Sequence, residues 1–120
     1  MIVSELEAGE VMARRFLAVA PEDTLGEVAE RMAAEDRGSA LVVGDGRLIG
    51  IVTSRDVLRA VAARVHPSEA RIREWMTSEP TAAPPDTPAS EAARLMLGGG
   101  FHHLPVVEDE RPVGMSACGR

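Results

Sequence analysis

The sequence has few aromatic residues, one cysteine and no long apolar run. Aromatic residues make up 2% of the chain and apolar residues 45%, so the core must consist of aliphatic side chains and methionine. The single cysteine, Cys118, cannot form an internal disulfide, which fits a reducing compartment. No apolar run has membrane-spanning length, and the first residues lack the basic and apolar regions of a signal peptide. We therefore expect a soluble, cytoplasmic protein.

Positive charge is also scarce. The formal net charge is −6, and no basic block is longer than the pair Arg14-Arg15. Because nucleic acid polymers are bound through clustered cations, the sequence argues against such a partner, whereas a mononucleotide needs only a few donors. The sequence contains no Ser-His-Asp set, no paired carboxylates in an apolar setting and no metal-ligand cluster. We expect neither an enzyme, nor a metal site, nor a required cofactor.

The chain repeats itself with an offset of 64 residues and no gap. Matched pairs run along the whole span and include Met12 and Met76, Pro21 and Pro85, Glu27 and Glu91, Met32 and Met96, and Gly50 and Gly114. One register held over this length indicates an internal duplication, and the copies are too long and too few for a solenoid. We place the two domains at residues 1–67 and 68–120.

Each copy begins with an extended segment followed by a helix. In the first copy Asp23 is the expected N-cap, and the second copy offers Thr87 as a cap before Pro88. Helical spacing of apolar residues follows in both copies: Leu25, Val28, Ala29, Met32 and Ala33, then Ala89, Ala92, Ala93, Met96 and Leu97. The triplet 98–100 is all glycine. We interpret it as the end of a helix, since nothing places it after a strand as a phosphate loop would require.

Two strands and a turn come next in each copy. Asp45-Gly46 is a strong hairpin signal, and the second copy has the turn at 108–110. After Thr53 the first copy enters another helix, with an apolar side formed by Val57, Leu58, Val61, Ala62 and Val65. The segment 67–76 is expected to hold a short helix, with Trp75 as a packing anchor. Each unit therefore reads β-α-β-β-α, and the second lacks its last helix.

This pattern resembles a tandem pair of CBS domains, called a Bateman module. The resemblance rests on the unit length, the element order, the duplication and the sequence "GIVTSRD" at 50–56 opening a helix. It implies an α+β fold in which two units pack through their sheets with pseudo-twofold symmetry and leave two clefts. Such clefts commonly bind AMP, ADP, ATP or S-adenosylmethionine. The modules often form homodimers and regulate an enzyme, channel or transporter.

The chemistry of residues 50–56 suits an adenosyl ligand. Gly50 allows close approach of the backbone, and Ile51 offers an apolar wall to a base. Thr53 and Ser54 place hydroxyls at a strand-to-helix junction, where phosphate oxygens are favoured. Asp56 can accept from both hydroxyls of a ribose. The alternative is that Thr53 or Ser54 only caps the helix and Asp56 only complements its dipole.

The resemblance places the other wall of this cleft on the partner unit. The corresponding positions are Pro80, Thr81, Phe101, His102 and His103. Adjacent residues of a strand point to opposite faces, so one histidine would face the cleft, and His102 could meet a phosphate. An ordinary polar strand position is the alternative for both histidines.

The second copy ends differently. At the same offset, Ala117 takes the place of Thr53 and Arg120 the place of Asp56. Skipping one residue would instead put Ser116 at the threonine position. We predict one competent cleft at most, and a surface left for another protomer to cover. A natural end, a truncation and an altered reading frame are equally compatible with this ending.

Two functions from different classes follow. The first is a regulatory module that senses an adenosyl ligand. The second is a ligand-free module for dimerisation or protein interaction, in which the same residues are only caps. A third, more distant reading is a regulatory piece of a larger enzyme resembling IMP dehydrogenase.

Overall fold

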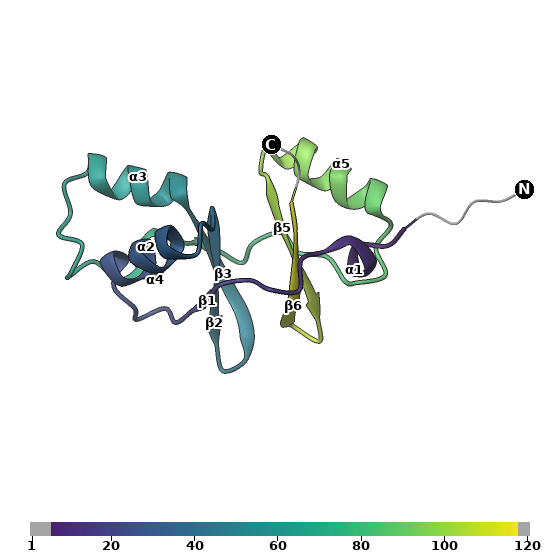
Figure 1. The fold of residues 1–120 in the computed structure, drawn as a ribbon, viewed down its shortest axis with the longest axis horizontal. Helices are drawn as coiled ribbons and strands as arrows, with labels where there is room; N and C mark the ends of the chain where they lie inside the picture. Colours follow the sequence, from purple (N-terminus) through teal and green to yellow (C-terminus); the bar gives the residue numbers. More distant parts are fainter. Residues whose placement is uncertain (1–5, 118–120) are drawn as a thin grey trace, which may run out of the picture. The chain divides into compact units, whose positions relative to one another are not determined.

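The computed structural model describes residues 6–117, which form two compact bodies. The central body comprises residues 17–80, and the terminal body comprises the residues before Leu17 together with those after Pro80. Both bodies combine helices with a sheet (Figure 1). The predicted α+β class is therefore confirmed.

The central body contains a four-stranded sheet and three helices. The strands are β1 (Ala18–Val19), β2 (Ser39–Gly44), β3 (Arg47–Thr53) and β4 (Thr77–Ser78), paired in chain order. Strand β1 is parallel to β2, and the other pairings are antiparallel. The helices are α2 (Leu25–Ala34), α3 (Ser54–Ala62) and α4 (Ile72–Trp75).

The terminal body repeats this plan with single bridges in place of the short edge strands. It contains α1 (Ala8–Val11), α5 (Ala89–Gly99), β5 (His103–Glu108) and β6 (Arg111–Ala117). Strands β5 and β6 form an antiparallel hairpin. Bridges from Ala83 to Val106 and from Ala13 to Met115 extend it on both sides. At the offset of 64 these bridges match the β1–β2 and β3–β4 pairings of the central body.

Each body is completed by a segment from the start of the other copy. The amides of Ala8 and Gly9 donate to the carbonyls of Thr87 and Pro85, at 2.6 and 2.8 Å. The equivalent amides of Ile72 and Arg73 donate to Asp23 and Pro21, at 2.9 and 3.0 Å. Residues 6–16 thus pack with the second copy. The domain limits at 67 and 68 describe the duplication and stay a prediction.

Both hairpins form as predicted, with different turn residues. Asp45 and Gly46 have φ of 53° and 78°, the left-handed values of a two-residue turn that suits the twist of a hairpin. The second turn uses Asp109 and Glu110, with φ of 53° and 67°. The predicted short helix near 67–76 is confirmed as α4, whereas its counterpart α1 was not predicted.

The predicted caps are one residue too early. Helix α2 begins after Thr24, whose hydroxyl accepts from the Glu27 amide, and α5 begins after Pro88. Asp23 instead accepts the Ala20 amide at 2.9 Å, so its carboxylate stabilises the turn before the helix. The glycine triplet ends α5 only at its last member, because Gly100 takes a φ of 72° while the first two remain helical.

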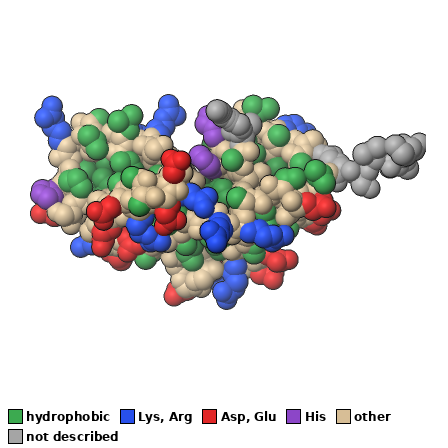
Figure 2. Space-filling view, in the orientation of Figure 1, with side chains coloured by type: hydrophobic (Ala, Val, Ile, Leu, Met, Phe, Trp, Pro, Cys, Tyr) green, Lys and Arg blue, Asp and Glu red, His purple; other side chains and the backbone are tan. Residues whose placement is uncertain are grey.

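The apolar side predicted for α3 is only partly the buried one, since Val57 and Val65 pack against the core as predicted. Asp56 and Ala60 are the buried residues of this helix, whereas Leu58 and Val61 are 69% and 60% exposed. The small Ala60 lets the helix pack closely, and Leu58 and Val61 lie at the surface. Figure 2 shows hydrophobic side chains at the surface over α3 and over α5, where Leu97 is exposed.

Candidate functional site

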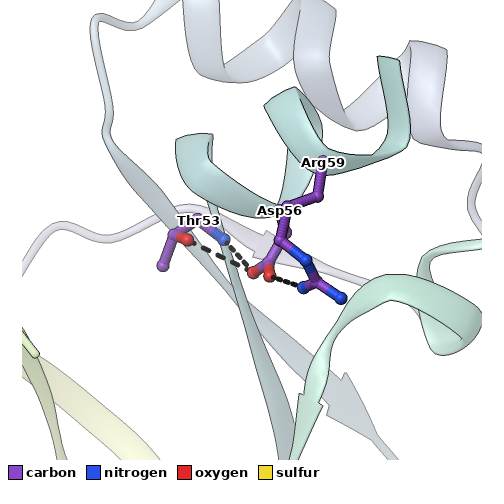
Figure 3. A network of polar contacts seen from close by, with 3 residues as sticks. All are labelled: Thr53, Asp56 and Arg59. Atoms are coloured by element: carbon purple, nitrogen blue, oxygen red, sulfur yellow. Dashed lines mark hydrogen bonds and ion pairs between the residues drawn. The ribbon is translucent and has the colours of Figure 1, made fainter. Parts of the chain in front are cut away.

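The predicted site lies where β3 runs directly into α3, without an intervening loop (Figure 3). Thr53 is the last residue of the strand and the N-cap of the helix, with φ −123° and ψ 169°. Ser54 opens the helix and is exposed. Its amide is already used, because it donates to the Gly38 carbonyl at 3.0 Å.

Asp56 lies in the first turn of α3 and is 7% exposed. Its Oδ2 accepts from the Thr53 amide at 2.9 Å and from the Thr53 hydroxyl at 3.2 Å. Its Oδ1 pairs with Nη1 of Arg59 at 3.0 Å. Hydrogen bonds to a charged group contribute about 1.5–3 kcal/mol, so Asp56 stabilises this junction whether or not a ligand is bound.

Arg59 and Trp75 were not predicted as parts of this site. The Arg59 guanidinium carbon lies 5.8 Å from the centre of the Trp75 ring, within the range of a cation–π contact. The spacing of Asp56 and Arg59 on one helix face could have indicated their ion pair. The contact with Trp75 had no such signal, because α4 approaches α3 only in the folded body.

Helix α2 begins with the same kind of contact, between a capping threonine and an acidic residue three positions later. The Thr24 amide and hydroxyl both donate to Glu27, at 3.0 and 2.9 Å. These bonds hold the pKa of Glu27 below its ordinary value. The interpretation of Asp56 as a capping residue therefore has structural support, and its contact with a ligand stays a prediction.

Gly50 has a packing role that the sequence did not reveal. A Cβ at this position would collide with the sulfur of Met76 and lie 3.0 Å from the Thr77 carbonyl oxygen. The second copy repeats the arrangement, since a Cβ at Gly114 would collide with the Met12 sulfur. Recurrence of the pair at the same offset shows that these glycines make room for methionine.

The remaining predicted residues fall in both bodies. Ile51 is buried in β3, and Pro80 is the last, half-buried residue of the central body. Thr81 and His102 are exposed in the terminal body, whereas Phe101 packs against its core. Their relation to Asp56 stays a prediction.

His103 begins β5 and is half-buried. Burial, followed by the positive charge of the neighbouring His102, lowers the pKa of His103 below its ordinary value. A lowered pKa favours the neutral imidazole, which can share a hydrogen bond with a ligand but offers no fixed positive charge to a phosphate.

Protonation of His103 should weaken the fold. Because its pKa is lower in the folded chain, the unfolded chain binds the proton more readily, and stability is lost as the pH falls from about 6.5 toward the folded pKa. We expect the melting temperature to fall less between pH 7.5 and 5.5 in His103→Gln than in wild type. His102→Gln should reduce the fall less, because it removes only the weaker cause. An unchanged pH dependence in His103→Gln would contradict this role.

The end of β6 decides the register of the second copy. Ala117 pairs with His103, just as Thr53 pairs with Ser39. Ala117 therefore takes the threonine position, and the alternative with Ser116 at that position is wrong. Ser116 is buried and pairs with Leu104. Cys118 and Arg120 lie outside the described residues. Within residues 6–117, β6 is the last element, and no helix equivalent to α3 follows it.

Within residues 6–117, no three His, Cys, Asp or Glu residues are arranged to hold a metal ion. None of the helices described is long and apolar enough to cross a membrane.

Known proteins share this sequence pattern and fold. A model of the CBS domain family matches residues 8–63 and 72–115. The CBS domain-containing protein CBSCBSPB1 of Arabidopsis thaliana is 40% identical over 100 residues, which cover 82% of this chain and 18% of that protein. The chain also spans less than two thirds of other curated relatives, for example 62% and 54% of two archaeal proteins.

Two solved structures bear on the ligand. A CBS domain protein from Pyrobaculum aerophilum complexed with AMP is 26% identical, with a TM-score of 0.87 over 93% of this chain and 87% of that one. The CBS domain pair of protein MJ0100, in complex with 5′-methylthioadenosine and S-adenosyl-L-methionine, is 25% identical, with a TM-score of 0.84 over 92% of both chains. With both copies matched by the family model, this chain belongs to the CBS domain family and carries two such domains in tandem.

Proposed function

We propose that this chain is a regulatory module that binds an adenosyl compound, such as AMP, ADP, ATP or S-adenosylmethionine, in the cleft between its two CBS domains. The main observation in support is the buried carboxylate of Asp56 at the junction of β3 and α3, where Thr53 and Ser54 also provide hydroxyls. The complexes of two relatives with AMP and with adenosyl sulfur compounds support the ligand class.

Asp56 can bind a ribose without giving up its cap. A carboxylate has about four acceptor positions, and three are used by Thr53 and Arg59. The Arg59 side chain is 61% exposed, so its displacement by a ligand hydroxyl costs little desolvation. We infer that a ribose hydroxyl takes the open position on Asp56 and that a second one shares or replaces the bond from Arg59.

The phosphate of a nucleotide would lie at the start of α3. The amide of Arg55 has no helical acceptor at this position, and the Ser54 hydroxyl is exposed. Together they offer the donors that favour an anion at a helix N-terminus. The opposite wall is assigned to Pro80, Thr81, Phe101, His102 and His103, with His103 neutral. A homodimer, a regulated enzyme or transporter and a cytoplasmic location belong to the same proposal.

A thermal-shift screen tests this function. Adenosyl ligands at about 100 times Kd should stabilise the chain by about 2.7 kcal/mol, and their guanosine counterparts should have a smaller effect. 2′-Deoxy-AMP should stabilise less than AMP, because Asp56 loses one of its two ribose hydroxyls. If millimolar adenosyl ligands leave the melting temperature unchanged, the proposal is wrong.

The second candidate is a ligand-free interaction module. The observation that favours it is that Asp56 already accepts three hydrogen bonds from Thr53 and Arg59, while Leu58 and Val61 are exposed on the same helix. It predicts a melting temperature that rises with protein concentration and does not respond to adenosyl ligands. The regulatory piece of a larger enzyme remains a further hypothesis.

A further inference from the structure

The terminal body has a surface groove whose lining residues all belong to that body. It measures about 670 Å³ and is bordered by the α1 region, by residues 84–86 and by the β5–β6 turn. Its half-buried lining residues are largely apolar, namely Met12, Pro85, Val107 and Val113 together with Gly9. These five residues define the apolar floor of the groove, whose volume has room for a side chain and its neighbour.

The rim of the groove is acidic. Five carboxylates line it, and the only basic residue among the lining residues is Arg14. All five are exposed. The Arg14 guanidinium donates to the Gly9 carbonyl at 3.4 Å. Figure 2 shows acidic side chains, in red, over the part of the terminal body where α1 lies. An apolar floor with this rim favours a partner that is itself apolar and positively charged.

At the equivalent place in the central body, two arginines bind Glu22. Arg73 pairs with the Glu22 carboxylate at 2.7 Å, and Arg71 donates to the Glu22 carbonyl at 3.0 Å. At the offset of 64, Glu22 corresponds to Asp86, while Arg73 and Arg71 correspond to Gly9 and Glu7. The terminal body thus keeps the acid but has a glycine and a second acid where the central body has arginines.

We propose that this groove docks a short basic segment of a partner protein, in which an arginine or lysine lies next to an apolar residue. The cationic head of the segment takes the role that Arg73 fills in the central body, and pairs with Asp86. Its aliphatic stem and the apolar neighbour cover Val107 and Val113, as long basic side chains do on apolar surface. This surface does not depend on any adenosyl ligand.

The test uses the whole 120-residue chain, labelled with ¹⁵N, and the capped tetrapeptide Leu-Arg-Leu-Arg at low ionic strength. We expect amide shifts confined to residues 7–14, Asp86 and residues 107–113, excluding the prolines, which have no amide proton. A peptide with citrulline in place of arginine should bind more weakly because it lacks the charge, and Gly-Arg-Gly-Arg because it cannot cover the floor. Absence of shifts at millimolar peptide overturns the proposal.

Two variants that remove equal charge distinguish binding in the groove from attraction to the overall negative charge of the chain. Asp86→Asn/Glu108→Gln/Asp109→Asn should weaken peptide binding about tenfold, as the loss of exposed charge pairs by both arginines of the peptide allows. Glu30→Gln/Glu35→Gln/Asp36→Asn removes the same charge from the central body. Each set contains one aspartate with a φ of 53°, a conformation that asparagine tolerates.

The control variant should bind the peptide like wild type. Equal weakening in both variants would show attraction to any acidic surface, and it overturns the proposal. Spermidine that causes the same shifts as the peptide, with similar affinity, would assign the groove to a small cation instead of a protein segment.

Discussion

Asp56→Ala abolishes the stabilisation that an adenosyl ligand gives the wild-type chain, and it also destabilises the unliganded chain. The first effect is expected because the ribose loses its only charged acceptor on α3. The second is expected because the Thr53 amide and hydroxyl lose the oxygen to which they donate. Loss of such a cap costs about 0.5–2 kcal/mol. Urea unfolding with and without ligand measures both.

Glu27→Ala is the matched control for this prediction. Glu27 accepts from Thr24 as Asp56 accepts from Thr53, so its removal also costs a cap at the start of a helix. It should lower the melting temperature and leave the ligand-induced rise intact. If Asp56→Ala retains the full rise, Asp56 is a cap only, and the ligand-free interaction module becomes the better account.

Gly50→Ala destabilises the chain by about 1–3 kcal/mol, as an added methylene does in a packed interior. The new Cβ meets the Met76 sulfur on one side and the Thr77 carbonyl on the other. The carbonyl is fixed by the pairing of Thr77 with Ile51, so the methionine must move. Gly114→Ala should have a similar cost, through Met12.

A double-mutant cycle isolates this contact. Met76→Ala removes the obstacle, so Gly50→Ala/Met76→Ala should be more stable than the sum of the two single effects predicts. The same should hold for Gly114→Ala with Met12→Ala. Strictly additive effects in urea unfolding would show that the methionine is not the reason for glycine at these positions.

Local patterns predicted most of the elements. The hairpin turn at Asp45-Gly46 depends on residues adjacent in sequence, and the buried stripe Leu25, Val28 and Met32 on one helix's own period. The side of α3 that faces the core was predicted only in part, since Val57 packs against the core and Leu58 does not. The positions of apolar residues alone do not identify that side. Asp56 can be buried because its carboxylate is hydrogen-bonded, while Leu58 lies at the surface.

The sequence by itself determined the duplication, the CBS pattern and the helix that begins after Thr53, because these follow from residue order and from patterns within one element. Only the tertiary structure decided which segment completes which sheet, and why Gly50 faces Met76 and Arg59 faces Trp75. Those contacts join residues separated along the chain. Their partners are selected by the packing of a whole body, which no local pattern encodes.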